Sequence, residues 1–259
     1  MSHLAYLRNT DNKAAASGVV ATAFSTASGY SVDNAITLPV AKVHRNTGVG
    51  SSEYIELDLG SAQAIKCAAV INHNLSSTAT ITIKGGAAAN PSTFTQTITW
   101  REFDAFVLFA ATQTYRYWRF TFTDNDNTYG FIQVGYLLLG AHTTISGYNF
   151  DKGWRRMREH GNRRLETSYF VPNIEQIARR IRLSLSFSAL ASAEITEVLT
   201  TLFDDLDGNV TPLFVIPDGA VNDGYFGRWV SVADETIIDG KPYVTLDFLE
   251  DGRGNLIAR

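Results

Sequence analysis

Apolar and polar residues alternate with a period of two along several stretches of the chain. The alternation is clearest in residues 54–59 and 116–123, where branched or aromatic side chains occupy every second position. Such spacing places the apolar side chains on one face of a β-strand. Further strand patterns follow at intervals of roughly ten residues over 68–71, 79–84, 94–100, 106–109 and 131–139. Gly, Asn and Asp separate them, which is typical of an all-β sandwich or jelly roll.

The pattern changes beyond residue 165. Residues 181–187 alternate cleanly, but apolar residues then recur at helical spacing over 192–206. Ser192 can cap this helix and Asp207-Gly208 can end it. Strand patterns resume at 212–217, 227–232 and 243–249. The second half is therefore predicted to be β-rich with a single α-helix.

The distribution of charge also divides the chain. Residues 1–147 hold nine basic and nine acidic residues, whereas residues 148–259 hold thirteen and seventeen, so the net charge of -4 lies in the second half (13 - 17 = -4). We predict a mainly β protein with an N-terminal jelly-roll-like β-sandwich over 1–145. A basic connector over 146–164 then leads to a C-terminal β-barrel or sandwich with one helix over 165–259.

The basic connector is the most unusual segment in its charge. Residues 152–164 contain six basic residues and one acidic residue, and Gly153 and Gly161 disfavour a helix there. A basic cluster can neutralise the phosphates of nucleic acid, but the whole chain is acidic, with a pI of about 5.7, which disfavours that partner. We predict instead a subunit interface in which Arg155, Arg156, Arg158, Arg163 and Arg164 face Asp204, Asp205 and Asp207.

Motifs for catalysis or metal binding are missing from the sequence. Cys67 is the only cysteine, which excludes an intrachain disulfide and a site with several thiolates and fits folding in a reducing cytosol. The five histidines form no His-Glu-x-x-His pattern, and neither a nucleophile elbow nor a phosphate-binding loop occurs. We therefore predict no catalytic residue, no metal site and no cofactor.

Two acidic segments partly match the pattern of a calcium-binding loop. Asp205-x-Asp207-x-Asn209 begins like a calcium-binding loop, but its sixth position is Val210 where that loop needs glycine. Asp124-x-Asp126 matches less well, so solvated turns are the favoured interpretation of both, with a loose structural calcium left open. No run of eighteen apolar residues and no secretory signal is visible, so we expect neither a membrane span nor conventional secretion.

Three segments of the first half resemble the discoidin-like (galactose-binding-like) sandwich family. They are Tyr-Ile-Glu-Leu-Asp-Leu-Gly at 54–60, Arg-Tyr-Trp-Arg-Phe at 116–120 and the closing strand at 132–140. The closing strand departs from the family at Gly135-Tyr136, where Glu is more usual before the last apolar run.

That resemblance implies ligand binding, often of sugars, through loops at one end of the sandwich. The candidate residues on these loops are Tyr30, His44, Arg45, Asn72, His73 and Asn74. Ordinary loops, or contacts to another subunit, remain alternative interpretations, because no single loop has the clustered aromatic residues of a sugar platform.

The second half resembles the β-barrel of distal tail and related tail-tip proteins of long-tailed bacteriophages. The resemblance rests on the order of strand, helix, proline-bounded strand and acidic end over 180–183, 192–206, 212–218 and 244–250. It implies a non-enzymatic structural component of a phage tail tip or baseplate, placed in the virion after assembly in the host cytoplasm. Its partners would be copies of itself and other tail proteins, with a cell-surface saccharide as a further candidate. The alternatives are a stand-alone carbohydrate-binding protein and, last, a glycosidase with scattered carboxylates.

Overall fold

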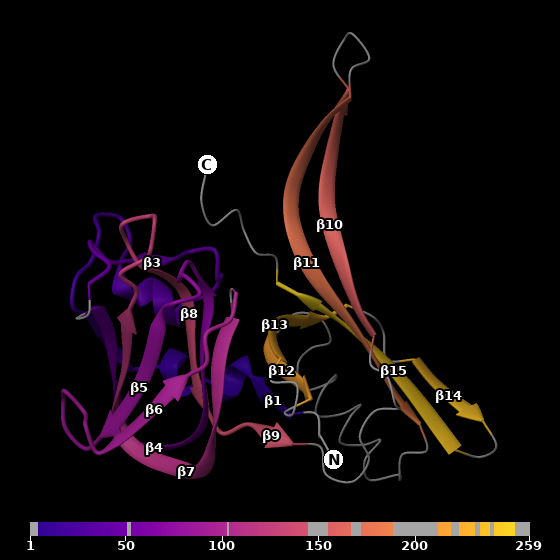
Figure 1. Cartoon of the computed structure of the whole chain (residues 1–259). Helices are drawn as coiled ribbons and strands as arrows, with labels where there is room; N and C mark the ends of the chain where they lie inside the picture. Colours follow the sequence, from indigo (N-terminus) through magenta and orange to yellow (C-terminus); the bar gives the residue numbers. More distant parts are fainter. Residues whose placement is uncertain are drawn as a thin grey trace. The chain divides into compact units, whose positions relative to one another are not determined.

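The computed structural model describes residues 5–50, 53–102, 104–144, 155–166, 172–188, 212–218, 223–230, 234–238 and 241–251. These residues form two antiparallel sheets with a few short 3-10 helices, which confirms the mainly β prediction (Figure 1). Each sheet belongs to its own compact unit. One unit, the sandwich, spans residues 10–142, and the second contains the described residues on either side of it. The helix predicted over 192–206 lies outside the described residues.

Two long strands build the sandwich by passing from one layer to the other. Strands β4 (Glu53–His73) and β7 (Asp104–Thr123) pair with each other, with register shifts between Asp58 and Gln63 and between Ile65 and Cys67. The sequence pattern predicts four strands here, and the structure joins them in pairs. The polar residues between the predicted halves form the corner, where Gly60 adopts a φ of 75° that favours glycine.

The remaining strands of the sandwich extend the two layers. Strand β4 residues 53–58 and β7 residues 117–123 lie in one layer with β2 (Val20–Ala23), β5 (Thr80–Gly86) and β6 (Phe94–Ile98). The later part of β4 and the early part of β7 lie in the other layer with β3 (His44–Arg45) and β8 (Gln133–Gly140). The predicted strands between 54 and 139 are thus confirmed as parts of this sheet.

The core between the two layers follows the predicted alternation. Trp118, Phe120 and Phe122 are fully buried, as the period-two pattern of this strand requires. The Trp118 ring stacks on Phe109 with a centroid separation of 5.9 Å and an interplanar angle of 5°. The edge of Phe94 meets Phe109 at 4.9 Å, so aromatic packing joins β6 to both halves of β7 in the middle of the sandwich.

Three short 3-10 helices lie in the first part of the chain, and the second and third of them contact strand β8. They are η1 (Asn9–Asp11), η2 (Lys13–Ala15) and η3 (Val32–Ile36). The buried side chain of Asn12 donates from Nδ2 to the Leu137 carbonyl oxygen at 2.9 Å and accepts from the Leu139 backbone N–H at 2.9 Å. Because β3 is only two residues long, Asn12 satisfies backbone groups of β8 that have no strand partner on that side.

The second unit contains an open sheet. Its strands follow the order β10 (Arg155–Glu166), β11 (Pro172–Ser188), β15 (Lys241–Glu250), β13 (Asp223–Trp229), β12 (Leu213–Asp218), β1 (Ala5–Arg8) and β9 (Thr143–Thr144), and β14 (Asp234–Ile238) forms a hairpin with β15. Among the described residues the two end strands do not meet, so these strands form an open sheet and not a closed barrel.

The structure places two segments in the second sheet that the sequence pattern assigned to the sandwich and to the connector. Strand β1 is placed by the sequence within the sandwich over 1–145, but it pairs with β12 and β9, and Ala5, Tyr6 and Leu7 are buried there. Residues 155–164 of the predicted connector form most of β10, since pairing with β11 satisfies their backbone groups. Its register shifts at Gly161/Asn162, where a glycine suits a β-bulge.

Candidate functional site

Side-chain amides connect the loops around β3 at one end of the sandwich. Asn72 donates from Nδ2 to the Val40 carbonyl oxygen at 2.9 Å. Asn74 donates from Nδ2 to the Phe131 carbonyl oxygen at 2.9 Å and accepts from the Gln133 backbone N–H at 2.7 Å. Three loops that are far apart in the sequence are therefore fixed together at this end.

The predicted residues Asn72, His73 and Asn74 support these loops. Asn72 and His73 are buried, with exposures of 4% and 3%, so their side chains do not form an open surface. The Leu75 backbone N–H donates to His73 Nδ1 at 3.2 Å. In this structure the three residues hold the chain in place beneath the surface of the loops.

His44 is also buried and acts on the backbone of a neighbouring loop. Its Nδ1 lies 3.0 Å from the carbonyl oxygen of Tyr30, and burial lowers the pKa of His44 below its usual value. The ring is therefore neutral at pH 7, and Nδ1 carries the hydrogen because a carbonyl oxygen only accepts. His44 thus fixes the position of Tyr30.

Arg45 lies between two aromatic rings. Its guanidinium carbon is 4.2 Å from the Tyr30 ring centroid and 4.6 Å from that of Phe131. Its Nε donates to Gln133 Oε1 at 2.7 Å. Tyr129, which is 46% exposed, continues the aromatic row with its ring 6.2 Å from Phe131. We call Tyr30, Arg45, Tyr129, Phe131 and Gln133 the Arg45 cluster.

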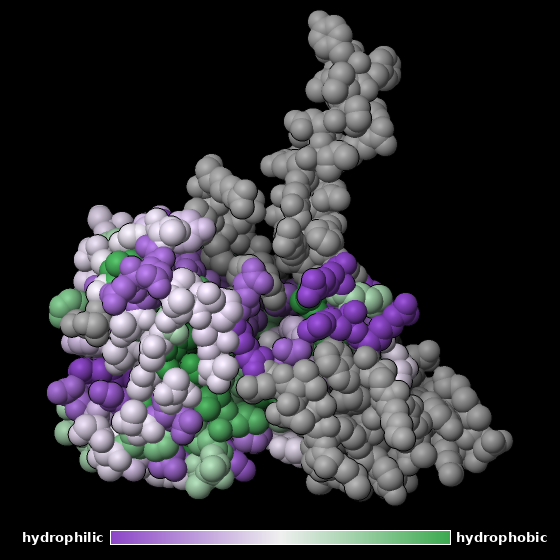
Figure 2. All heavy atoms as spheres, in the orientation of Figure 1, coloured by the Kyte–Doolittle hydropathy of each residue, from purple (hydrophilic) through white to green (hydrophobic). Residues whose placement is uncertain are grey.

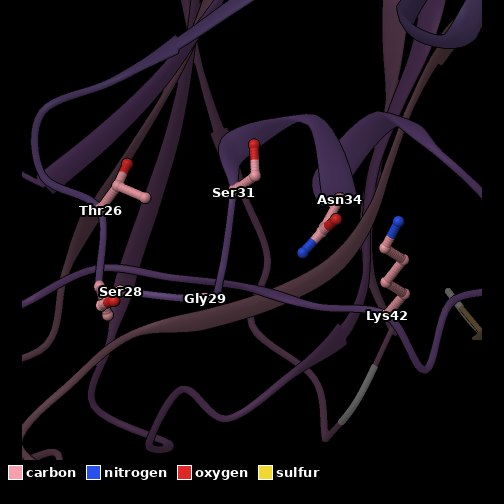
Figure 3. Close-up of a pocket in the computed structure, with 7 residues that line it drawn as sticks. Thr26, Ser28, Gly29, Ser31, Asn34 and Lys42 are labelled. Atoms are coloured by element: carbon pink, nitrogen blue, oxygen red, sulfur yellow. The ribbon is translucent and has the colours of Figure 1, made fainter.

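The loop that carries Tyr30 also borders an open hollow of about 540 Å³ (Figure 3). Mainly small and polar residues line it: Thr26, Ala27, Ser28, Gly29, Ser31, Asn34 and Lys42. Figure 3 shows Asn34 and Lys42 on one side of this hollow and Thr26 and Ser28 on the other. The Ala27 backbone N–H donates to the Arg45 carbonyl oxygen at 2.8 Å, which links the hollow to the Arg45 cluster.

The surface around these loops has the character expected for a polar ligand. On the side of the sandwich turned towards the viewer in Figure 2, the residues at the β3 end are mostly hydrophilic or near neutral. Arg45 makes no ion pair with any residue that the structure describes, and neither does Lys42. This end therefore presents two cations, several hydroxyl groups and aromatic rings.

The sequence predicts binding residues on loops at one end of the sandwich, and that assignment of function stays a prediction. The structure brings Tyr30, His44 and Arg45 together, but neither the hollow nor the contribution of Tyr129 and Phe131 was predicted. The available signal was the pair of aromatic residues on either side of Gly130. Each loop on its own contains few aromatic residues, and the aromatic rings of different loops come close together only in the folded chain.

The acidic turn at Asp124, considered above as a loose calcium site, uses its carboxylate to accept hydrogen bonds from neighbouring loop residues. Asp124 is 1% exposed and accepts from the Ser76 backbone N–H at 2.8 Å, the Ser76 hydroxyl and Asn127 Nδ2 at 3.0 Å. Within the described part of the chain, no group of three His, Cys, Asp or Glu residues could hold a metal ion. Cys67 is buried, which raises the pKa of its thiol to about 12 and leaves it unreactive as a nucleophile.

The predicted interface arginines lie on strand β10. Arg155, Arg156 and Arg158 are exposed, and the strand continues through Arg163 and Arg164. Arg156 forms an ion pair with Asp223 at 3.0 Å and donates to the Tyr225 hydroxyl oxygen at 3.0 Å, so it contacts its own unit. The acidic residues Asp204, Asp205 and Asp207 lie outside the described residues. No helix of the described chain has the length and apolar character to cross a membrane.

No protein-family model and no curated protein matches the chain. Three of the solved structures to which it is similar are carbohydrate-binding domains. Chitosan-binding module 1 from a chitosanase/glucanase of Paenibacillus sp. IK-5 is 18% identical, covers 50% of this chain and 98% of the module, and has a TM-score of 0.42. The lectin domain of Lectinolysin, complexed with Lewis B antigen, is 18% identical over 50% of this chain and 96% of that domain, with a TM-score of 0.42. A fucose binding module of Streptococcus pneumoniae is 13% identical over 50% and 97%, with a TM-score of 0.41. At these identities and scores, the ligand has to be argued from the residues of this chain.

Proposed function

We propose that the sandwich is a non-catalytic saccharide-binding module whose site is the Arg45 cluster with the adjoining hollow. The observation that carries the proposal is the position of the Arg45 guanidinium. It lies between the rings of Tyr30 and Phe131 and is oriented by Gln133, yet no described carboxylate pairs with it.

The contacts of Arg45 prepare it to donate hydrogen bonds to a ligand. Gln133 takes the Nε hydrogen, so the donors on the two terminal nitrogens remain for another acceptor. A guanidinium presents these donors in a planar fork that suits two adjacent oxygen atoms, such as neighbouring hydroxyls of a sugar ring. Because the two rings already restrict the side chain, binding loses less conformational entropy than it would with a mobile arginine.

The rest of the site supplies complementary surfaces for a sugar. The exposed ring of Tyr129 offers an apolar face and a hydroxyl group, and the apolar C–H groups of a sugar can pack on such a ring. The hydroxyls of Thr26, Ser28 and Ser31 line the hollow and can donate or accept hydrogen bonds. A few polar groups around an open recess are what orientation of a small polar ligand requires.

The proposal is tested by titrating the full-length protein with saccharides in a calorimeter after a glycan-array screen. Arg45→Ala is expected to weaken binding by about tenfold or more, since hydrogen bonds to a charged group are among the stronger ones. Arg45→Lys, which keeps the charge but loses the fork, is expected to lose most of the affinity as well.

Arg116→Ala is the matched control for this experiment. Arg116 also lies over an aromatic ring, that of Tyr117 at 5.0 Å, but on a different strand and paired with Asp58 at 2.6 Å. Its replacement should leave saccharide affinity unchanged. Circular dichroism shows whether each variant is folded. The proposal fails if no saccharide binds, or if folded Arg45 variants bind as tightly as the unaltered protein.

A structural role in a phage tail tip is the second candidate, favoured by the shape of the β10–β11 pair. Strand β15 pairs with β11 only over Arg182–Ser188, so residues 172–181 of β11 pair with β10 alone. The pair continues past the rest of its sheet as a two-stranded ribbon (Figure 1). An isolated two-stranded ribbon is marginally stable in water, so a protein surface against it would stabilise it. Such a contact suits assembly into a baseplate in the host cytoplasm and a place in the virion.

This second candidate is tested by light scattering of the purified protein. We expect the full-length chain to form rings or other oligomers at high concentration. A variant in which residues 160–178 are replaced by an Asn-Gly turn is expected to stay monomeric, because the ribbon is then removed. A monomeric full-length protein at the highest concentration reached would exclude self-assembly through the ribbon.

A further inference from the structure

Among the described residues that line the hollow beside the Arg45 cluster, Lys42 alone is cationic. It is exposed, and no described carboxylate forms an ion pair with it. Its backbone N–H donates to the Pro39 carbonyl oxygen at 2.9 Å, which fixes the turn that carries it. The ammonium group is thus held at the rim of a polar recess without a partner in its own unit.

The carboxylates of Asp33 and Glu53 accept hydrogen bonds from neutral side chains and, within the described part of the chain, form no ion pair with Lys42 or Arg45. Asp33 belongs to η3 and its carboxylate accepts a hydrogen bond from the Ser31 hydroxyl at 3.2 Å. Glu53 is 5% exposed and accepts from Ser25 at 2.8 Å and from Asn46 at 2.6 Å, so it is engaged beneath the loops. Lys42 and Arg45 are therefore two cations at the loop end with which no described carboxylate forms an ion pair.

We infer that the saccharide bound here carries an anionic group, a carboxylate or a sulfate, that Lys42 and Arg45 contact together. This inference rests on the proposed saccharide-binding function and names the chemical class of its ligand. The fork of Arg45 accommodates two oxygen atoms of such a group, and Lys42 adds a point charge with three donors. The hydroxyls around the hollow remain for the neutral part of the sugar. A wholly neutral saccharide would leave Lys42 hydrated and without a function in binding.

The experiment compares three ligands on the full-length protein by calorimetry: an oligogalacturonate, its methyl ester and the neutral oligogalactose. A sulfated galactose oligomer forms a fourth arm that separates sulfate from carboxylate. We expect the acidic ligands to bind at least about fivefold more tightly than the neutral ones at low salt, as one additional ion pair allows. Raising the salt from 50 to 500 mM should reduce this preference, because it screens exposed charges.

Variants assign the preference to Lys42. Lys42→Gln is expected to lower the affinity for the acidic ligands by about fivefold and the affinity for neutral ligands by much less. Lys84→Gln is the matched control, because Lys84 lies on strand β5, opposite Thr95 and Arg119 in the sheet.

The outcomes separate the two proposals. Equal binding of acidic and neutral ligands overturns the inference and leaves the saccharide-binding function standing. Binding of none of the ligands, together with an empty glycan screen, overturns the proposed function itself. An acidic preference that survives Lys42→Gln overturns the assignment to Lys42.

Discussion

Gly135 allows the loop that carries Lys42 to pack closely against strand β8. A Cβ atom at Gly135 would lie 2.5 Å from the Val40 carbonyl oxygen and 2.7 Å from the Cβ of Asn72. Asn72 has a φ of 57°, in the left-handed region that asparagine tolerates better than most residues. Glycine and asparagine at these two positions therefore allow close packing beneath the candidate site. The same packing gives a physical reason for the departure of Gly135-Tyr136 from the family pattern.

Replacing Gly135 by alanine should destabilise the sandwich. We expect the free energy of unfolding to fall by about 1–3 kcal/mol, because the added methyl group overlaps backbone and side-chain atoms that are themselves hydrogen-bonded. Chemical denaturation of the full-length protein measures the change. Gly50→Ala is the control, since a Cβ there meets no heavy atom within 4 Å, and a change within about 0.5 kcal/mol is expected. Unaltered stability of Gly135→Ala would mean that the loop moves away at little cost.

Single residues also show where sequence reasoning reaches its limit. The alternation that buries Trp118 and leaves its neighbours Tyr117 and Arg119 partly exposed is local, so it could be predicted from the sequence. The burial of His44 and Asn72 could not, because both are polar residues whose environment is created by loops distant in the sequence. For the same reason the aromatic contacts of Arg45 became visible only in the fold.

Strand β1 is an element whose position in the fold could not be predicted from the sequence. Its residues pair with β12 over Ala5↔Ile216 to Arg8↔Leu213 and with β9 on the other side. The apolar Ala-Tyr-Leu run suits a strand that is buried in the middle of a sheet. The sequence pattern does not show to which sheet this strand belongs, because local periodicity does not identify the strands with which it pairs.

Deletion of residues 1–9 should loosen the second sheet and leave the sandwich intact. Without β1, alternate backbone groups of β12 lose their hydrogen-bond partners and the apolar side chains of that strand lose cover. Hydrogen exchange followed by mass spectrometry should show exchange in β12 faster by roughly tenfold or more. Strands β4 and β7 serve as the internal control. Equal protection of β12 with and without residues 1–9 would show that β1 contributes nothing to its stability.

The division of the whole molecule into two β-rich parts could be predicted from the sequence. The charge density changes at residue 147, close to the end of the sandwich at residue 142, and the hydrophobic periodicity changes later, beyond residue 165. The connection between the parts could not be predicted, because the chain starts in one sheet, builds the other and then returns. The candidate site was predicted only as one end of the sandwich, since Lys42 and the aromatic residues Tyr129 and Phe131 come from separate loops that only the fold brings to that end.

The return of the chain to its first sheet determines an order of events during synthesis. Strand β1 emerges from the ribosome first, yet its partner Ile216 follows Ala5 by 211 positions (216 - 5 = 211). At roughly 5–20 residues per second, that interval is on the order of ten to forty seconds. The sandwich is fully synthesised within it and is able to fold first, while the edge of β1 that pairs with β12 still lacks its partner. A newly made chain therefore has a finished sandwich before it has a finished second sheet.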